Sequence, residues 1–413
     1  MNKKNNFQKN MNKKITSMKM CVKGGGEHHN DTYKKRQSGI ELIKILAILL
    51  IVFSHLTQTL GSIPSSYNYT TEYWINFAVA STNLQTIALA LFQHCGSAGN
   101  LIFLIASSWF LCSKTNLKST KITTMILNVW TISVLILFFF LIFGANVTTK
   151  NIIKCFFPNF LCTNWFITCY ILLYISHPLL NTILCAYNKK QLFIIVSIMF
   201  GLYYVLGYLS PNKLFFSPLI LFYTVYLTVA YIRFYLKEIV LYKKVSILLI
   251  VIGILGIVIP CLAMEILGQY YNFFSDKVLH WCNNQNIFIF LFALGLFGYA
   301  NNLKFHSNFV NKLSSLSLLV YIIHENLLVR EYLRPYLYDY IYSNYNHAYN
   351  FILLVMLSLS LLFFVLSNIF AFIYSITIQK AVIYIANKAT LKIKECIMQF
   401  IDRFDDNEKS NQP

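Results

Sequence analysis

The sequence predicts an all-α polytopic membrane protein with about ten transmembrane helices and both termini in the cytoplasm. Of its 413 residues, 57% are hydrophobic and only 12% are charged, and the mean hydropathy is +0.57. A soluble protein with so few charges could not keep its surface wet, so most of the chain is expected to face lipid or lie inside a helical bundle. The length suits about ten spans with short loops, at about 20 residues per span.

Ten apolar segments supply the predicted spans, which we place at residues 40–60, 84–112, 124–144, 164–185, 191–209, 214–235, 245–267, 285–301, 313–333 and 350–378. The stretch QHCGSAGN interrupts the second segment, and this predicts a shorter helix followed by a re-entrant piece. Together the spans form a transmembrane domain over residues 39–378. We find no internal repeat, which argues against transporters built from inverted repeats.

The two ends of the chain are polar. Residues 1–38 are basic, contain Gly and Asn and lack apolar periodicity, which predicts a disordered cytoplasmic arm. The apolar run that follows has the full length of a span and is not typical of a cleaved signal peptide. Residues 379–413 are predicted to be a cytoplasmic tail, with an interfacial helix around Val382 and Ala386 and then a charged end.

The net charge of +19 indicates an orientation in the membrane rather than a nucleic-acid partner. Ten Lys and Arg residues precede residue 40, and with the N-terminus inside, the cytoplasmic loops carry eleven against six in the outer loops. Basic residues are retained on the cytoplasmic side, so both termini are predicted inside. No basic domain with interleaved aromatic residues is present, and nucleic-acid binding is not expected.

The stretch KILAILLIVFSH places Lys44 and His55 at the two ends of an apolar helix. Eleven residues of α-helix rise about 16 Å and turn about 1100°, so the two side chains lie within roughly 20° of one face. A charge at membrane depth costs about 2.5–3.5 kcal/mol on insertion scales, which favours a site facing protein or a cavity. Glu41 lies one turn before Lys44 and can pair with it. The alternative is a snorkelling Lys with a hydrogen-bonded structural His.

Four segments resemble the integral-membrane acyltransferase-3 family, in the same order along the chain. GIELIKILAILLIVFSH is similar to its first span, whose signature is Arg or Lys, ten residues and then His. IFLIASSWF, NWFITCYILLYISHPLLN and LVYIIHENLLVREYL resemble three further segments, and the resemblance covers about residues 38–375. Two positions depart from the family: Lys44 stands for the commoner Arg, and Ser108 stands for a Gly.

The resemblance implies transfer of an acyl group, usually acetyl, from cytosolic acyl-CoA to a hydroxyl, often on an envelope glycan. Lys44 would guide the phosphate end of pantetheine, and Lys118 and Lys121 match a basic pair that would bind the CoA phosphates. Lysine-rich loops are also common at cytoplasmic ends for reasons of topology alone. His55 would be the general base on the acceptor hydroxyl, or would be acylated transiently itself.

His324 and Glu325 form a second candidate constellation. Adjacent residues on a helix point about 100° apart, so one is expected to face the cavity while the other packs elsewhere. Glu325 would orient His55 or a substrate hydroxyl, with Arg330 near enough to stabilise charge. A buried Glu–Arg pair that closes the helix end is the alternative.

The ten cysteines form no CxxC pair or metal-ligand spacing, so no metal is expected. A disulfide between Cys155 and Cys162 stays open at this stage.

The expected setting is the cytoplasmic membrane of a bacterium, crossed several times. Some members of the family carry an extracellular hydrolase-like domain that completes the transfer. We expect this chain to acylate its glycan directly or to pass the group to a separate extracellular transferase. A polysaccharide flippase, another transporter, a glycan polymerase and a membrane anchor remain as rival functions. A polymerase would place several Arg residues in external loops, where only Arg330 and Arg334 come close.

Overall fold

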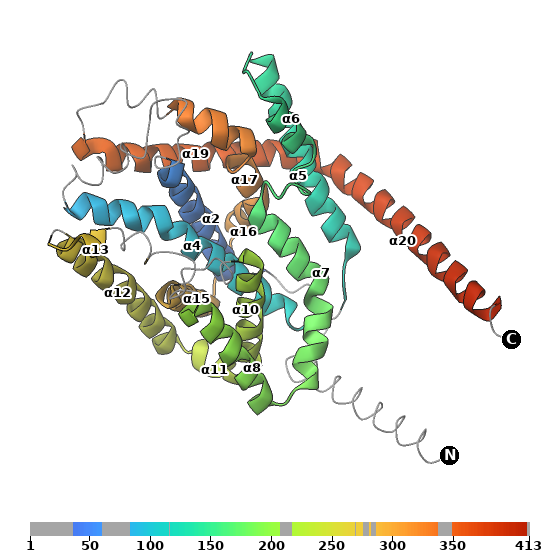
Figure 1. The fold of residues 1–413 in the computed structure, drawn as a ribbon, viewed down its shortest axis with the longest axis horizontal. Coiled ribbons are helices and arrows are strands. Elements are labelled where there is room, and N and C mark those ends of the chain that lie inside the picture. Colours follow the sequence, from blue (N-terminus) through green and yellow to red (C-terminus); the bar gives the residue numbers. More distant parts are fainter. Residues whose placement is uncertain are drawn as a thin grey trace.

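The computed structural model describes residues 36–59, 83–114, 116–206, 217–268, 270–275, 281, 286–337 and 349–410. Within these ranges the regular elements are all helices and no strand occurs, which confirms the all-α class (Figure 1). Most of the predicted disordered arm, residues 1–35, and the last three residues of the predicted tail lie outside the described residues.

The helices of ordinary α geometry are α2 Ser38–Thr59, α4 Asn83–Leu111, α5 Ser119–Ile142, α6 Thr149–Phe156, α7 Trp165–Ala186, α8 Lys189–Gly201, α10 Pro218–Tyr231, α11 Lys237–Val240, α12 Lys243–Gly268, α13 Asn272–Ser275, α15 Ile287–Asn301, α16 Asn308–Ser315, α17 Ser317–His324, α19 Tyr349–Thr377 and α20 Gln379–Ser410. Three π-helical turns accompany them: η2 Leu202–Leu206, η4 Ile232–Leu236 and η5 Val329–Leu333.

The described residues contain seven helices long and apolar enough to cross a membrane, or eight if one bent pair is counted as a span. The bent pair joins Asn308–His324 to Val329–Leu337 at an angle of 60°. The protein is therefore a polytopic membrane protein, but with fewer full-length spans than the predicted ten. The segment predicted at 285–301 forms the short apolar helix Ile287–Asn301, and the segment predicted at 84–112 forms α4, whose apolar part is Cys95–Leu111. A helix of 15 residues rises only about 22 Å, less than the roughly 30 Å of a bilayer core.

Helix α4 runs unbroken through QHCGSAGN, so the predicted interruption and re-entrant piece are wrong. The small residues serve packing instead. A Cβ added to Gly99 would lie 2.4 Å from the Ala47 carbonyl oxygen of α2, and one added to Gly96 would lie 2.6 Å from the Ser54 hydroxyl. Small residues let helix backbones approach closely in a membrane. These small residues let α4 pack closely against α2. The packing fixes the position of α2, and with it His55, relative to the rest of the bundle.

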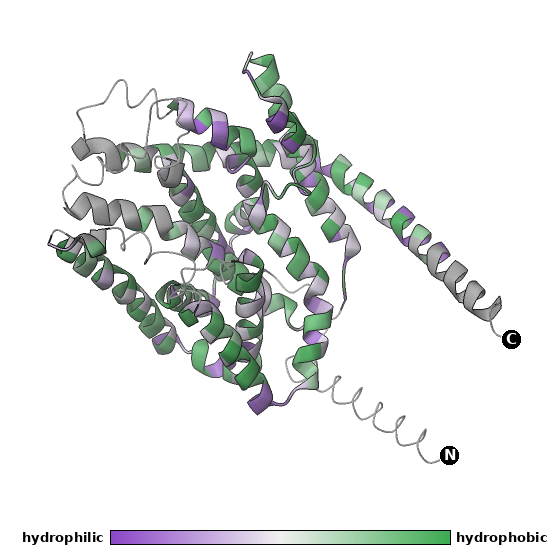
Figure 2. Cartoon of the chain, in the orientation of Figure 1, coloured by the Kyte–Doolittle hydropathy of each residue, from purple (hydrophilic) through white to green (hydrophobic). Residues whose placement is uncertain are grey.

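The centre of the bundle is built from α2, α4, α10 and α15, whose buried side chains form one apolar cluster. Helices α12 and α19 lie at its periphery and bury little of their apolar surface inside the protein. Apolar residues dominate both of these helices (Figure 2). This is the surface expected to face lipid tails.

Helix α20 follows α19 directly and continues to Ser410. Val382, Ala386 and Thr390 are buried at i, i+4 and i+8, and α20 packs against α5. The Thr390 hydroxyl also contacts the Thr123 hydroxyl at 2.9 Å. The first turns of the predicted tail are therefore part of the bundle. Cys155 and Cys162 are both free thiols, so they form no disulfide here.

Candidate active site

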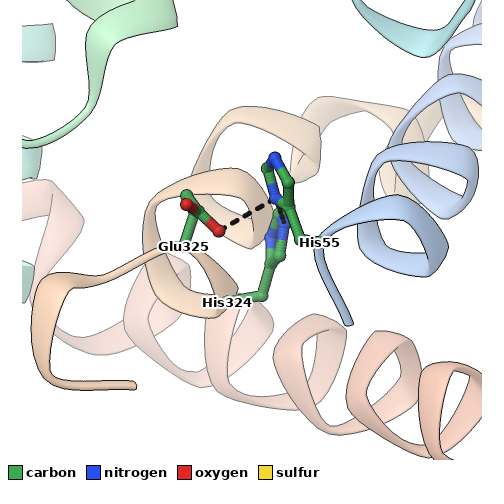
Figure 3. Close-up of side chains that lie close together, drawn as sticks. All are labelled: His55, His324 and Glu325. Atoms are coloured by element: carbon green, nitrogen blue, oxygen red, sulfur yellow. Dashed lines mark hydrogen bonds and ion pairs between the residues drawn. The ribbon is translucent and has the colours of Figure 1, made fainter. Parts of the chain in front are cut away.

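Two helices that are far apart in the sequence bring three ionisable side chains together (Figure 3). His55 lies near the end of α2, and His324 and Glu325 lie at the end of α17. The Nδ1 atom of His55 is 3.0 Å from Nε2 of His324 and 2.9 Å from Oε2 of Glu325. The three predicted catalytic residues thus form one cluster.

Both neighbours in the sequence reach the same nitrogen, so the expectation that one of them packs elsewhere is wrong. The reason is the helix end. The α-helix stops at His324, and Glu325 is its C-cap with φ −102° and ψ 16°, outside helical geometry. The 100° spacing of an ideal helix does not apply to a cap residue.

The hydrogen bonds assign the protons on the two imidazoles. Nδ1 of His324 lies 2.8 Å from the Val320 carbonyl oxygen, which can only accept, so this nitrogen carries a proton. Nε2 of a neutral His324 is then an acceptor, and His55 donates its Nδ1–H toward Glu325 and His324. The basic lone pair of His55 consequently resides on Nε2, on the far side of the ring (Figure 3).

Two arginines compensate the buried carboxylate of Glu325. Arg330 Nη1 lies 3.2 Å from Oε1, and Arg334 Nη2 lies 2.7 Å from Oε2. Arg334 is 2% exposed and also donates to the backbone carbonyls of His324 and His55. A buried charge is tolerated when it is paired and hydrogen-bonded in this way. The predicted Glu–Arg pair and the contact with His55 therefore occur together, on one carboxylate.

Arg334 is the residue of this site that the sequence does not identify, because the span pattern predicts it to be a cation of an outer loop. It follows Arg330 by one helical turn and Glu325 by nine positions. Charged residues within a membrane segment usually pair with one another. The closeness of Arg334 to Glu325 in the sequence is therefore the signal that could have predicted this ion pair. Asn164, buried before α7, also reaches the site and donates to the Glu325 carbonyl oxygen at 3.4 Å.

A cavity of about 580 Å³ leads toward the cluster from the basic end of α2. Arg36, Lys44 and Lys121 line one part of it, while Ile51 and Tyr321 belong to its apolar lining. Tyr321 is also next to the cluster, with its ring centroid 6.3 Å from that of His55 and 5.7 Å from that of His324. His55, His324 and Glu325 are not part of the lining themselves, and Tyr321 is the residue that joins the cavity wall to the cluster.

The three lysines predicted to bind CoA differ in position. Lys44 lines the cavity and pairs with Glu41 at 2.7 Å, as the sequence spacing predicts. Lys121 lines it too and donates to the Tyr170 hydroxyl at 3.1 Å. Lys118 is exposed at the start of α5 and is not part of the lining.

The ligand atoms of His55, His324 and Glu325 lie within 4.8 Å of one another, a spacing that can hold a metal ion. Oε2 of Glu325 already accepts from the Arg334 guanidinium. A metal bound there would lie beside a second positive group, which costs Coulomb energy in a buried site. The charge balance therefore favours an ion-pair cluster over a metal centre.

Comparison with known families decides the class of protein. A family model described as an acyltransferase domain (Acyl_transf_3) matches residues 37–376. The chain belongs to the acyltransferase-3 family. Comparison with the curated proteins and with the solved structures gives no match. The protein is thus a multi-pass membrane acyltransferase, and the matched region contains the whole His55–His324–Glu325 cluster.

Proposed function

We propose that this acyltransferase moves an acyl group, most simply acetyl, from cytosolic acyl-CoA to a hydroxyl of a cell-surface or envelope glycan. The observation that carries the proposal is the contact between His55 Nδ1 and the Glu325 carboxylate at 2.9 Å, beside a cavity with basic residues in its lining. A carboxylate on Nδ1–H orients an imidazole and leaves Nε2 as the proton acceptor, as in hydrolytic triads.

His55 then acts as general base and general acid in turn. Nε2 takes the proton of the acceptor hydroxyl while the oxygen attacks the thioester carbonyl carbon. When the tetrahedral intermediate collapses, the C–S bond breaks and the thiolate takes the proton back from His55. The Glu325 charge stabilises the imidazolium between these steps. Direct acylation of His55 would use the same lone pair and remains the variant of this mechanism.

Positive charge near the cavity fits the phosphates of CoA. The pKa of Lys114 is lowered, first by partial burial and then by the charges of Lys121, Lys118 and Arg233. These four cations form a basic patch in which they lie close enough to repel one another, and a bound anion would reduce the repulsion. Lys118 would therefore contribute through this patch, whereas Lys44, Lys121 and Arg36 would contact the donor inside the cavity.

The proposed setting is the cytoplasmic membrane of a bacterium, with both termini inside. Under the predicted orientation Lys44 and the patch face the cytosol, where acyl-CoA is made available, and His55 lies toward the outer side. The acceptor would be the glycan itself or a separate extracellular transferase. No nucleic acid takes part.

Membranes carrying the wild type or His55→Ala, supplied with acetyl-labelled acetyl-CoA, test the proposal. The wild type should hydrolyse the donor or transfer label to glycan. In the His55→Ala membranes that rate should fall on the order of 10²–10⁴-fold, as expected for a lost general base. Equal rates in the two membranes would remove the assignment and bring the flippase or polymerase functions forward.

The same membranes distinguish a metal-free mechanism from a metal centre. Because the Arg334 pair already compensates Glu325, we expect chelation by EDTA to leave acetyl transfer unchanged. Loss of transfer with EDTA and its recovery with one divalent cation would show that the three clustered residues bind a metal.

A further inference from the structure

Three hydroxyl-bearing side chains follow one another along the cavity wall on α16 and α17. Ser314, Ser317 and Tyr321 follow one another at i, i+3 and i+7, and all three line the cavity. Seven residues of helix rise about 10 Å. The row therefore extends over much of the distance between the level of Lys44 and the histidine cluster.

All three hydroxyl oxygens are buried, and none has a hydrogen-bond partner among the described residues. The residues are 5%, 6% and 5% exposed. A buried hydroxyl without a partner costs about 1–3 kcal/mol, so proteins rarely keep several together without use. Ser315 differs, because its hydroxyl donates to the Lys312 carbonyl at 2.6 Å.

Tyr321 occupies a special place at the inner end of this row. Its ring contacts both His55 and His324. Its hydroxyl has no hydrogen-bond partner among the described residues, which leaves the hydroxyl proton available to an acceptor in the cavity.

We propose that Ser314 and Ser317 bind the amides of the pantetheine arm, and that the Tyr321 hydroxyl donates to the thioester carbonyl oxygen. This assignment rests on the proposed function. As the acceptor oxygen attacks the carbonyl carbon, the carbonyl π electrons move onto the oxygen, where the Tyr321 O–H stabilises the negative charge. The pair returns to re-form C=O, the C–S bond breaks and the thiolate leaves with the proton held by His55. Tyr321 keeps its own proton throughout.

Tyr321→Phe removes this donor and keeps the ring. We expect kcat to fall on the order of 10²–10³-fold, as for a single lost oxyanion donor. The Kd for CoA, which lacks the acyl carbonyl, should stay unchanged. Because the hydroxyl has no partner in the protein, the melting temperature should not fall. A kcat within twofold of wild type, or a weakened CoA complex, would overturn the role of Tyr321.

Ser314→Ala with Ser317→Ala tests the rest of the row, with Ser315→Ala as the matched control. The double variant should weaken CoA binding about fivefold to a hundredfold, the loss expected for two net hydrogen bonds. The control should bind as the wild type does, since its hydroxyl is already used. Equal Kd values for double variant and wild type would overturn the pantetheine assignment.

His55→Ala is assayed in parallel, so that the two proposals fail separately. Transfer that depends on His55 and ignores Tyr321 overturns this inference alone. If transfer is independent of His55, the proposed function fails with it.

Discussion

At the scale of single residues, one ring nitrogen organises the site. His55 Nδ1 meets both His324 and Glu325, and the charge of Glu325 is in turn held by Arg330 and Arg334. The spacing of Lys44 and His55 was visible in the sequence, as was the Lys44–Glu41 pair. The convergence of His324 and Glu325 was not, because it depends on where the helix ends.

Glu325→Gln tests whether the carboxylate orients His55. The amide keeps the shape but loses the charge that stabilises the imidazolium, and it can favour the wrong tautomer. We expect kcat for acetyl transfer to fall on the order of 10²–10⁴-fold. Because the change also removes the charged partner of Arg334, the rate is expressed per amount of folded protein. Activity within threefold of wild type would show that Glu325 has no part in the proton transfer.

Arg334→Met should destabilise the fold far more than Arg330→Met. Loss of a buried partner leaves Glu325 undercompensated and costs about 3–5 kcal/mol. Arg330 is 36% exposed, and an exposed pair of this kind contributes about 0–1 kcal/mol. Apparent melting temperatures of the solubilised variants measure the difference. An equal fall in melting temperature for the two variants would show that Arg334 stabilises Glu325 no more than Arg330 does.

At the scale of elements, the contact between α2 and α4 determines where His55 lies. The residues of QHCGSAGN have the composition of a helix break, and the sequence alone predicts one there. Inside the bundle their small size is used for close approach, and the backbone stays helical. Composition alone does not distinguish these outcomes, since glycine serves turns and tight helix pairs equally well.

Gly99→Ala should destabilise the bundle, with Gly201→Ala as its control. The new Cβ at position 99 would lie 2.4 Å from a backbone oxygen of α2, so one helix must shift. We expect a loss of about 1–3 kcal/mol together with reduced activity. At Gly201 no atom lies within 4 Å of the added Cβ, and the melting temperature should stay level or rise slightly. A tolerated Gly99→Ala would contradict this packing argument.

At the scale of the whole molecule, one cavity is lined by Lys44 and Lys121 and by Tyr321, whose ring contacts both histidines of the cluster. The sequence predicted the membrane class, most span positions and the ionisable residues. It overestimated the number of full-length spans, because Ile287–Asn301 is shorter than a bilayer crossing and the segment after it is a bent pair of helices. The sequence also did not indicate that α20 forms part of the cavity wall. Three residues of this helix line the cavity, although they lie beyond the matched family domain: Gln379, Ile383 and Asn387.

Lys118 and Lys121 should differ in their effect on the kinetics of acetyl-CoA. Lys121→Ala should raise KM for acetyl-CoA more than Lys118→Ala, because only Lys121 lines the cavity. Both variants should leave kcat near that of wild type, because the contacts to the phosphates are equally strong in the bound substrate and in the transition state. A larger effect at Lys118 would move the donor phosphates out of the cavity and onto the exposed patch.

The central claim is that the cavity delivers the acyl group of acyl-CoA to His55. A structure of the protein bound to a non-hydrolysable acyl-CoA analogue tests it most directly. We predict phosphates at Lys44 and Lys121, pantetheine along α16 and α17, and the acyl carbonyl beside Tyr321 and His55. An analogue bound elsewhere, with its acyl group away from His55, would contradict the account.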